Sequence, residues 1–300
     1  MPPIHPNIGN TGHGMLDMAE RENDASAEAL EDIAYLSRSA HRVAILDGLT
    51  EGPYSRRTLV ELTGASRTTL DRIMNELEEK GWAARTADGT YVATAQGTHL
   101  MKRFRPFVES VEALHRLDDA VAWLPIDELS IGLEHFSDAA VRRPETADPV
   151  ETIDFMDDLL TTASEFRVLA HLVPPEPIGE TMRDSVVSGQ MTMDGVLTDT
   201  LFSYLTADPE RAARWNTVVK AGADLYRREG PIPCNLWIFD ETVLIKKSGP
   251  EPIDDSYGVP IVTENSTVRS WAHDLIDNWI TDAARIDGKA FFDDSSVSSE

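Results

Sequence analysis

The stretch that decides the fold spans residues 55–95 and reads SRRTLVELTGASRTTLDRIMNELEEKGWAARTADGTYVATA. Residues 58–63 place two leucines at helical spacing behind Ser55, a candidate N-cap. Gly64 follows, where a helix C-terminus favours a residue that tolerates a positive φ. A second helix is predicted over residues 66–80, because it begins with another serine and is followed by another glycine. The stretch therefore predicts two short helices joined by a tight turn.

The second predicted helix has an apolar face and a polar face. Its apolar residues fall at i, i+3, i+4 and i+7, the spacing of a stripe that packs on a core, and they are Leu70, Ile73, Met74 and Leu77. At about 100° per residue, Thr68, Arg72 and Asn75 lie on the opposite side of the helix. Hydroxyl, guanidinium and carboxamide groups can form hydrogen bonds with base edges and phosphates.

A two-stranded hairpin is predicted directly after this helix. Residues 82–85 and 90–94 alternate in the manner of strands, and the Asp88-Gly89 pair between them is a strong signal for a two-residue hairpin turn. Helix, turn, helix and hairpin in this order predict a winged helix-turn-helix domain.

The charge of this region favours contact with DNA. Residues 55–103 hold eight Lys and Arg against six Asp and Glu, whereas the whole chain has a net charge of −25. Contacts to DNA phosphates require such a local basic excess. An amphipathic helix pair in an unrelated globular domain is the alternative interpretation. The side chains predicted to bind DNA are Arg56, Arg57, Ser66, Arg67, Thr68, Thr69, Arg72, Asn75 and Arg85.

Composition indicates an acidic protein with more than one domain. Three hundred residues favour two domains. The acidic excess and few lysines resemble proteins of salt-loving microbes. The net charge is therefore better explained by a salty solvent than by the kind of molecule that the protein binds. Cys234 is the single cysteine, which excludes an intramolecular disulfide and fits a reducing cytoplasm. Without a run long enough to span a membrane and without a secretory signal, a soluble cytoplasmic protein is expected.

The composition changes along the chain predict five segments and a multidomain α+β fold. In order they are a disordered arm (1–25), the winged helix-turn-helix domain (26–95), a long helix with a connector (96–150), an α/β domain (151–286) and an acidic, Ser-rich tail (287–300).

The longest predicted helix, residues 96–124, carries a heptad stripe. Its apolar residues alternate at spacings of four and three, which favours a partner helix, although packing on the same domain is equally compatible. A homodimer that binds palindromic DNA is predicted on this basis. The interface residues would be Leu100, Phe104, Phe107, Val111 and Leu114.

The C-terminal half alternates between helices and strands. Helices are predicted at 152–163, 175–188, 199–205, 209–220 and 267–284, and strands at 166–172, 191–197, 223–227, 234–239, 242–247 and 259–263.

Four short segments resemble a known family. They are IAYLSRS at 33–39, EKGW at 79–82, LWIFDETV at 236–243 and VRSWA at 268–272. With the order of elements, they resemble haloarchaeal transcriptional regulators of the methanogenesis-regulatory-protein family, over roughly residues 29–284. The resemblance implies a DNA-binding transcriptional regulator. Its C-terminal domain would sense a small effector or mediate oligomerisation, and it also looks like half of a phospholipase-D-type fold.

The chain departs from the phospholipase-D enzymes at their catalytic residues. The His-x-Lys-x4-Asp signature is absent, so the histidine nucleophile and the lysine that stabilises phosphate are missing. Dinucleotide, Walker-type, hydrolase and zinc-protease motifs are absent too. The sequence therefore predicts no catalytic residue, no cofactor and no metal site. The alternative is a protein whose winged helix mediates only protein contacts, joined to an uncharacterised phosphodiesterase-like domain.

Three other features have a simpler structural interpretation. Asp154, Asp157 and Asp158 fit a solvated helix face in a chain with 52 acidic residues. His171, at the end of an apolar strand, fits a core histidine with satisfied hydrogen bonds. Trp237 fits a strand covered on both faces.

Overall fold

The computed structural model describes residues 27–126, 129–142, 149–249 and 260–291. It divides into two compact units, residues 1–105 and residues 106–300. The sequence placed this division near residue 150, whereas the second unit begins at Pro106. The predicted arm, residues 1–25, lies outside the described residues.

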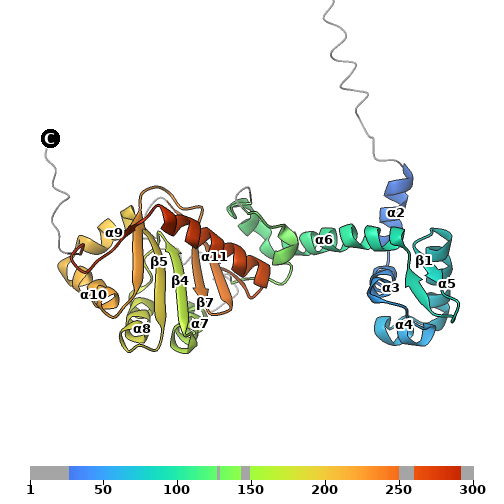
Figure 1. Ribbon diagram of the computed structural model, residues 1–300, viewed down its shortest axis with the longest axis horizontal. Coiled ribbons are helices and arrows are strands. Elements are labelled where there is room, and N and C mark those ends of the chain that lie inside the picture. Colours follow the sequence, from blue (N-terminus) through green and yellow to red (C-terminus); the bar gives the residue numbers. More distant parts are fainter. Residues whose placement is uncertain (1–26, 127–128, 143–148, 250–259, 292–300) are drawn as a thin grey trace, which may run out of the picture. The chain divides into compact units, whose positions relative to one another are not determined.

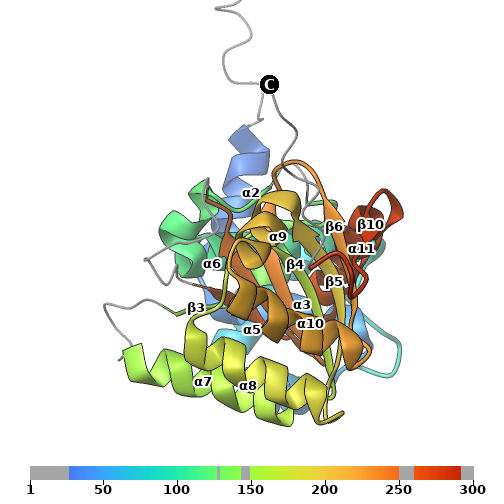
Figure 2. The ribbon, with the colours of Figure 1, turned by 90° about the vertical axis from the view of Figure 1, so that its left-hand side faces the viewer.

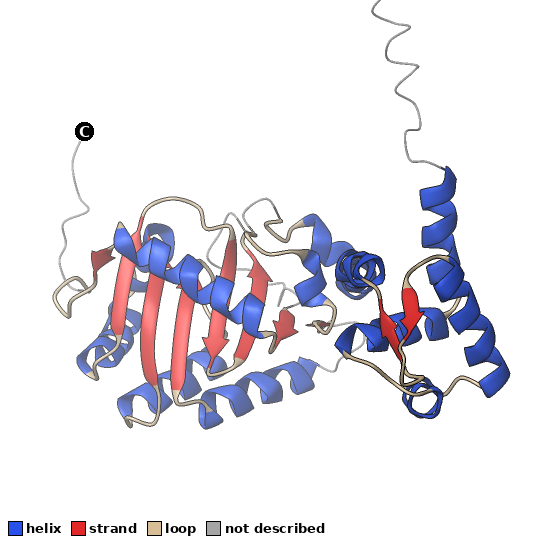
Figure 3. Cartoon of the chain, turned by 45° about the vertical axis from the view of Figure 1, so that its right-hand side comes forward, coloured by secondary structure: helices blue, strands red, loops and turns tan. Residues whose placement is uncertain are grey.

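The first unit is helical with a short hairpin, which Figure 3 shows beside the helices. Its elements are α2 (Ala27–Ser37), α3 (Ala40–Glu51), α4 (Arg56–Thr63), α5 (Arg67–Glu79), β1 (Ala83–Arg85), β2 (Tyr91–Ala93) and the start of α6 (Ala95–Leu117). The four residues of the predicted stripe on α5 are all buried, as their spacing requires. Each large apolar side chain buried in this way contributes about 1.5–3 kcal/mol.

The hairpin turns at the predicted place, but its loop has three residues, 87–89, where two were predicted. The Thr86 N–H donates to the Thr90 carbonyl oxygen at 2.9 Å, which extends the strand pairing to these two residues. Gly89 adopts φ 85°, a conformation that favours glycine. Strands β1 and β2 pair antiparallel, with Arg85 opposite Tyr91. Tyr54 extends this pairing by an isolated bridge to Tyr91, in which each residue's N–H donates to the other's carbonyl oxygen at 2.9 Å. The winged arrangement predicted from residues 55–95 is therefore present.

Helix α6 is shorter than predicted. It ends at Leu117, because Asp118 adopts φ 49° and a short 3-10 helix, η1 (Asp118–Ala122), follows. The apolar spacing of the predicted helix continues to Val121, which lies outside the α-helix. Pro106 lies inside α6, where a proline removes one backbone hydrogen bond.

The second unit is built on an eight-stranded mixed sheet. Its described elements, after η1, are η2 (Leu133–Phe136), β3 (Ala140–Val141), α7 (Pro149–Thr162), β4 (Glu165–Ala170), α8 (Glu176–Val187), β5 (Thr192–Thr198), α9 (Asp199–Thr206), α10 (Pro209–Lys220), β6 (Asp224–Arg228), β7 (Cys234–Phe239), β8 (Thr242–Lys247), β9 (Ile261–Thr263), α11 (Ser266–Thr281) and β10 (Ala284–Arg285). The strand order is β10-β6-β5-β4-β7-β8-β9-β3. Strands β4, β5 and β6 run parallel, and the other neighbours pair antiparallel.

Helices cover both faces of this sheet. Figure 1 shows α11 across one face, and Figure 2 shows α7 to α10 on the other side. One apolar cluster, containing Phe166 and Trp237, joins the sheet to α7–α10. The other, containing Leu236 and Trp271, joins it to α11 and to residues 113–139. The chain is therefore a mixed α and β protein, with a helical N-terminal domain and a sheet-containing C-terminal domain.

Two predicted boundaries change because of packing. The connector is part of the second unit, because Leu124, Leu129 and Phe136 are buried in the cluster under α11. The predicted tail begins too early, because Phe291 is 3% exposed and its ring lies 5.3 Å from that of Phe202. The two-residue strands β3 and β10 were not predicted.

Candidate nucleic-acid interface

Local hydrogen bonds fix the two helices at the predicted turn. Ser55 caps α4 by accepting from the Thr58 N–H, and Ser66 caps α5 by accepting from the Thr69 N–H, each at 3.2 Å. Gly64 ends α4 at φ 66°, and this left-handed conformation disfavours any residue with a Cβ atom. Serine caps and a glycine turn thus set the start of α5 beside α4.

The outward face of α5 is polar, as predicted. Thr68, Arg72 and Asn75 are exposed, while the opposite stripe is buried. This places a hydroxyl, a guanidinium and a carboxamide on the accessible side of the helix, the groups that form hydrogen bonds with base edges in a major groove. Arg72 Nη1 donates to Glu76 Oε1 at 2.8 Å, so its guanidinium is oriented by the next turn of the same helix.

Glu76 links α5 to α2 and α3. Its Oε2 accepts from the Tyr35 hydroxyl at 2.9 Å and from Arg42 Nη2 at 3.2 Å. Burial alone would raise the pKa of Glu76, but the hydrogen bonds from Tyr35 and Arg72 and the nearby guanidinium charges hold it below its usual value. Burial, the hydrogen bond to Glu76 and its negative charge raise the pKa of Tyr35. The network attaches α5 to its scaffold.

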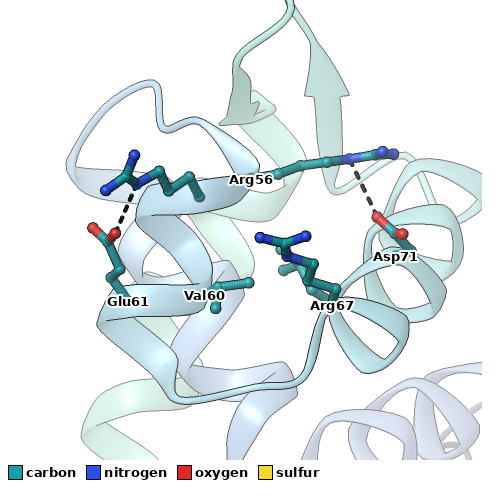
Figure 4. Close-up of a pocket in the computed structure, with 7 residues that line it drawn as sticks. Arg56, Val60, Glu61, Arg67 and Asp71 are labelled. Carbon is teal, nitrogen blue, oxygen red and sulfur yellow. Dashed lines mark hydrogen bonds and ion pairs between the residues drawn. The ribbon is translucent and has the colours of Figure 1, made fainter.

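Three arginines line a notch between α4 and α5 (Figure 4). The notch has a volume of about 570 Å³, and Arg56, Arg57 and Arg67 lie around it with Val60, Glu61, Leu70 and Asp71. Arg56 Nε lies 3.3 Å from Asp71 Oδ1, and Arg57 Nε donates to Glu61 Oε1 at 2.9 Å. Figure 4 shows the Arg67 side chain reaching into the space between the two helices.

The hairpin contributes one arginine to this side of the unit. Arg85 is exposed, and its guanidinium lies 5.9 Å from the centre of the Tyr91 ring. The turn is held by the carboxylate of Asp88, which accepts from the Thr86 and Thr90 hydroxyls. These hydrogen bonds, that from Thr86 foremost, keep the pKa of Asp88 below its usual range.

The nine predicted DNA-binding residues have different roles in the structure. Arg56, Arg57 and Arg67 meet at the notch, and Thr68, Arg72 and Asn75 share the outward face of α5. Ser66 and Thr69 are engaged with each other at the helix cap, with their hydroxyl oxygens 2.8 Å apart. Arg85 stands in the hairpin. Tyr91 was expected only as a strand residue, yet it contacts both Arg56 and Arg85.

The predicted dimer stripe is only partly accessible. Phe107 is 60% exposed and Leu114 is 42% exposed, whereas Leu100 and Val111 are half-buried. Phe104 is 7% exposed and has little surface to offer to a second chain. The exposed part of the stripe is therefore Phe107 and Leu114, one heptad apart.

The polar residues of the second unit are mostly engaged in internal contacts. His171 is buried, as predicted, and its Nδ1 lies 2.8 Å from the Thr198 hydroxyl. The prediction that its hydrogen bonds are satisfied is wrong for Nε2, which has no partner in the described part of the chain. Asp157 accepts from the Thr181 hydroxyl at 2.6 Å. Among the described residues, no group of three His, Cys, Asp or Glu side chains is arranged to hold a metal ion.

A charged cluster lies under α11. Arg167 in β4 donates to Asp194 at 3.0 Å and to Asp277 at 2.6 Å, and its Nη1 lies 2.9 Å from His273 Nδ1. Burial, followed by the Arg167 charge, lowers the pKa of His273. Burial raises the pKa of Asp194, although Arg167 opposes this effect. The cluster fastens α11 to the central strands.

Two family models match this chain. The HVO_A0261 N-terminal domain matches residues 30–116, and the middle domain of the methanogenesis regulatory protein FilR1 matches residues 149–282. Together they cover most of the helical unit, α6 up to residue 116 and most of the sheet unit. A search of curated proteins gave no match. No helix in the described ranges is long and apolar enough to cross a membrane.

Three solved structures that resemble this chain are distant likenesses. TrmBL2, described as an archaeal chromatin protein with a novel mode of DNA binding, is 14% identical over 85% of this chain and 98% of its own, with a TM-score of 0.37. The dimethyltransferase RosA from Streptomyces davawensis is 12% identical over 73% of this chain and 82% of its own, with a TM-score of 0.24. The O-methyltransferase NcsB1 is 15% identical over 70% of each chain, also at 0.24. Likenesses at this level carry no conclusion about function.

Proposed function

Because this chain belongs to the methanogenesis-regulatory-protein family of winged helix-turn-helix regulators, we propose that it binds double-stranded DNA and regulates transcription in the cytoplasm. The observation that carries the proposal is the outward face of α5. It presents Thr68, Arg72 and Asn75 while the opposite stripe is buried, and an arginine-lined notch lies beside it. In this proposal α5 enters the major groove and reads base edges, while arginines of the notch and hairpin contact phosphates.

We further propose that the sheet unit is not an enzyme but a module that senses a small effector or joins subunits. Its resemblance to half of a phospholipase-D-type fold would be one of architecture only, because the sequence lacks the catalytic histidine and lysine of those enzymes. His171 is 7% exposed and one of its ring nitrogens lies against the Thr198 hydroxyl, and this burial supports a role in the core over one in catalysis.

The test is a gel shift with DNA from upstream regions, run at several KCl concentrations up to high salt. Wild-type protein is expected to bind one such fragment more tightly than unrelated DNA. Arg72→Ala is expected to lose about 1–3 kcal/mol on that fragment and to relax its specificity, because a guanidinium that reads a base carries sequence information.

The matched control is Arg214→Ala in α10. Arg214 is also an exposed helical arginine with one carboxylate partner, Glu176 at 2.9 Å, but it lies in the sheet unit. This variant should bind like wild type. Wild-type selectivity in the Arg72→Ala protein would remove the proposed reading role. An absence of binding by the wild type at every salt concentration would favour a winged helix that contacts only proteins.

A further inference from the structure

Tyr91 is a buried residue that lies against two exposed arginines of the proposed DNA-binding surface, Arg56 and Arg85. Its side chain is 2% exposed, and its hydroxyl accepts from Arg56 Nε at 3.1 Å. The guanidinium groups of Arg56 and Arg85 lie 5.6 and 5.9 Å from the centre of its ring. The two backbone hydrogen bonds with Tyr54 fix β2 at this residue. A rigid part of the hairpin thus sets the position of two exposed arginines.

Arg56 is held from one side only. Both Tyr91 and Asp71 engage its Nε atom, at 3.1 and 3.3 Å. Within the described residues, no hydrogen bond to its terminal amino groups is present, and the side chain is 53% exposed. An arginine has five N–H donors in a planar fork, so the terminal amino groups are available to an anion. Arg56 therefore joins α4, α5 and β2 and still presents donors outward.

The notch beside Arg56 has the chemistry of a phosphate site. Arg67, from the first turn of α5, reaches into it and forms no ion pair within the described part of the chain. Arg56 and Arg67 together supply two guanidinium groups to one open space between two helices. A planar fork held in place loses less conformational entropy on binding than a freely rotating side chain. It also suits bidentate recognition of a phosphate.

We propose that this notch seats a phosphodiester of the DNA backbone between Arg56 and Arg67, and that Tyr91 is the positioning residue that orients Arg56. The proposal rests on the DNA-binding function proposed above. Asp71 assists through the same Nε atom. With Asp71 on the Nε side, 3.3 Å away, and the terminal amino groups on the phosphate, the Arg56 guanidinium lies between two anions and screens one from the other.

The test uses Tyr91→Phe in the full-length protein, because this change removes one hydroxyl and no charge. Dissociation constants are measured on the selected fragment and on unrelated DNA over a range of KCl concentrations. Tyr91→Phe should weaken both complexes alike by about 3-fold to 10-fold, the effect of losing one hydrogen bond. It should also reduce the slope of log K against log[KCl] by up to about 0.9, the value for one phosphate contact.

Tyr54→Phe is the matched control. Tyr54 pairs with Tyr91 through the backbone but makes no side-chain hydrogen bond to Arg56, so this variant should bind within twofold of wild type. The thermal midpoint of each variant is measured to confirm folding. A Tyr91→Phe protein that is folded and equals Tyr54→Phe in affinity and salt slope overturns the proposal.

A second variant, Arg56→Lys, tests the same idea on an exposed side chain. It keeps the positive charge but lacks the Nε atom that both partners engage. Affinity should again fall by about 3-fold to 10-fold, and adding Tyr91→Phe should change it less than twofold further. Wild-type affinity in Arg56→Lys would show that only charge matters and would overturn the positioning role. If the wild type binds DNA and these variants bind it equally well, the proposed phosphate site is rejected and the DNA-binding function stands. If the wild type does not bind DNA, the proposed function itself is rejected.

Discussion

A single carboxylate, that of Glu76, connects three helices of the N-terminal unit. It accepts hydrogen bonds from Tyr35 in α2, Arg42 in α3 and Arg72 in α5 itself. Arg42 is also stacked on the Tyr35 ring, with its guanidinium carbon 4.0 Å from the ring centre. Because α5 carries the proposed reading residues, the orientation of Arg72 depends on the charge of Glu76.

The first prediction concerns the stability of this network. Glu76→Gln should destabilise the N-terminal unit by about 1–3 kcal/mol at pH 7, since charge-assisted hydrogen bonds are replaced by weaker ones. Unfolding by urea measures the change in the full-length protein. Glu78→Gln is the control, because Glu78 is exposed on the same helix. Within the described chain, its carboxylate accepts no hydrogen bond from another helix. An equal loss of unfolding free energy in both variants would show that Glu76 contributes no more than an exposed acidic residue.

The same carboxylate makes this difference depend on pH. The pKa of Glu76 is lower in the folded state than its usual value. Its stabilisation is therefore fully present above the unfolded pKa of about 4.3 and is lost as pH falls through the folded pKa. The gap between wild type and Glu76→Gln should be constant from pH 7 to about pH 5 and should shrink below about pH 4. A gap that grows on acidification would contradict this assignment.

At the scale of elements, the start of α6 is packed directly on the chain that enters β1. A Cβ atom added at Gly97 would lie 2.1 Å from the carbonyl oxygen of Trp82. Thr94 links the same segments, because its hydroxyl donates to the Gly81 carbonyl at 2.6 Å and its N–H donates to the Trp82 carbonyl at 2.9 Å. Only glycine permits this approach of helix and hairpin.

Gly97→Ala should therefore destabilise the protein by about 1–3 kcal/mol, the usual effect of overpacking. Gly48→Ala in α3 is the matched comparison, because a Cβ there meets no atom within 4 Å. Alanine at that helical position should be neutral or stabilise by up to about 1 kcal/mol. Thermal unfolding of both variants gives the comparison. If Gly97→Ala is as stable as Gly48→Ala, α6 moves away from the Trp82 carbonyl without loss of stability, and the prediction is wrong.

Helices and strands with a regular spacing of apolar residues were predictable from the sequence, and elements without such a spacing were not. Strands β7 and β8 have the predicted bounds, because their apolar runs are bounded by polar turn residues. The two-residue strands β3 and β10 carry no period to detect. The end of α6 depends on the positive φ of Asp118, which the apolar spacing across it does not reveal.

The candidate site was predictable in composition but not in its contacts. The helical period places Thr68, Arg72 and Asn75 on the outward face. By contrast, the contact between Arg56 and Tyr91 joins residues 35 positions apart, and it exists only once β2 is folded beside α4. The burial of Phe104 likewise depends on packing that a heptad pattern does not specify.

At the scale of the whole molecule, the exposed part of α6 bears on assembly. Winged helices gain affinity when two copies bind a palindromic site. Phe107 and Leu114 remain exposed one heptad apart on α6, and burying each against a second helix would contribute about 1.5–3 kcal/mol. Salt would screen the repulsion between two subunits of net charge −25. We therefore predict a homodimer through α6, favoured at high KCl.

Light scattering at several KCl concentrations should give twice the chain mass of 33.2 kDa. Phe107→Asp combined with Leu114→Asp should give a folded monomer with weaker DNA binding. Val187→Asp is the control, because Val187 is an exposed apolar residue on α8, 51% exposed, outside this stripe. A wild-type monomer throughout, or a double variant that stays dimeric, would place the interface elsewhere or remove it.

The turn between β7 and β8 has a consequence for how the chain folds during synthesis. Asp240, at φ 47°, accepts hydrogen bonds from the backbone N–H groups of Ser164 and Glu165 at the start of β4. During synthesis, β4 leaves the ribosome about 70 residues before β7, because β4 begins at Glu165 and β7 at Cys234. Strand β7 pairs with one edge of β4. Until then that edge is open to other chains, a known route to aggregation. Strands β7 and β8 are neighbours in the sequence and can pair as soon as both are synthesised. The Asp240 carboxylate in their turn then binds the start of β4, which fixes the position of the hairpin on that strand.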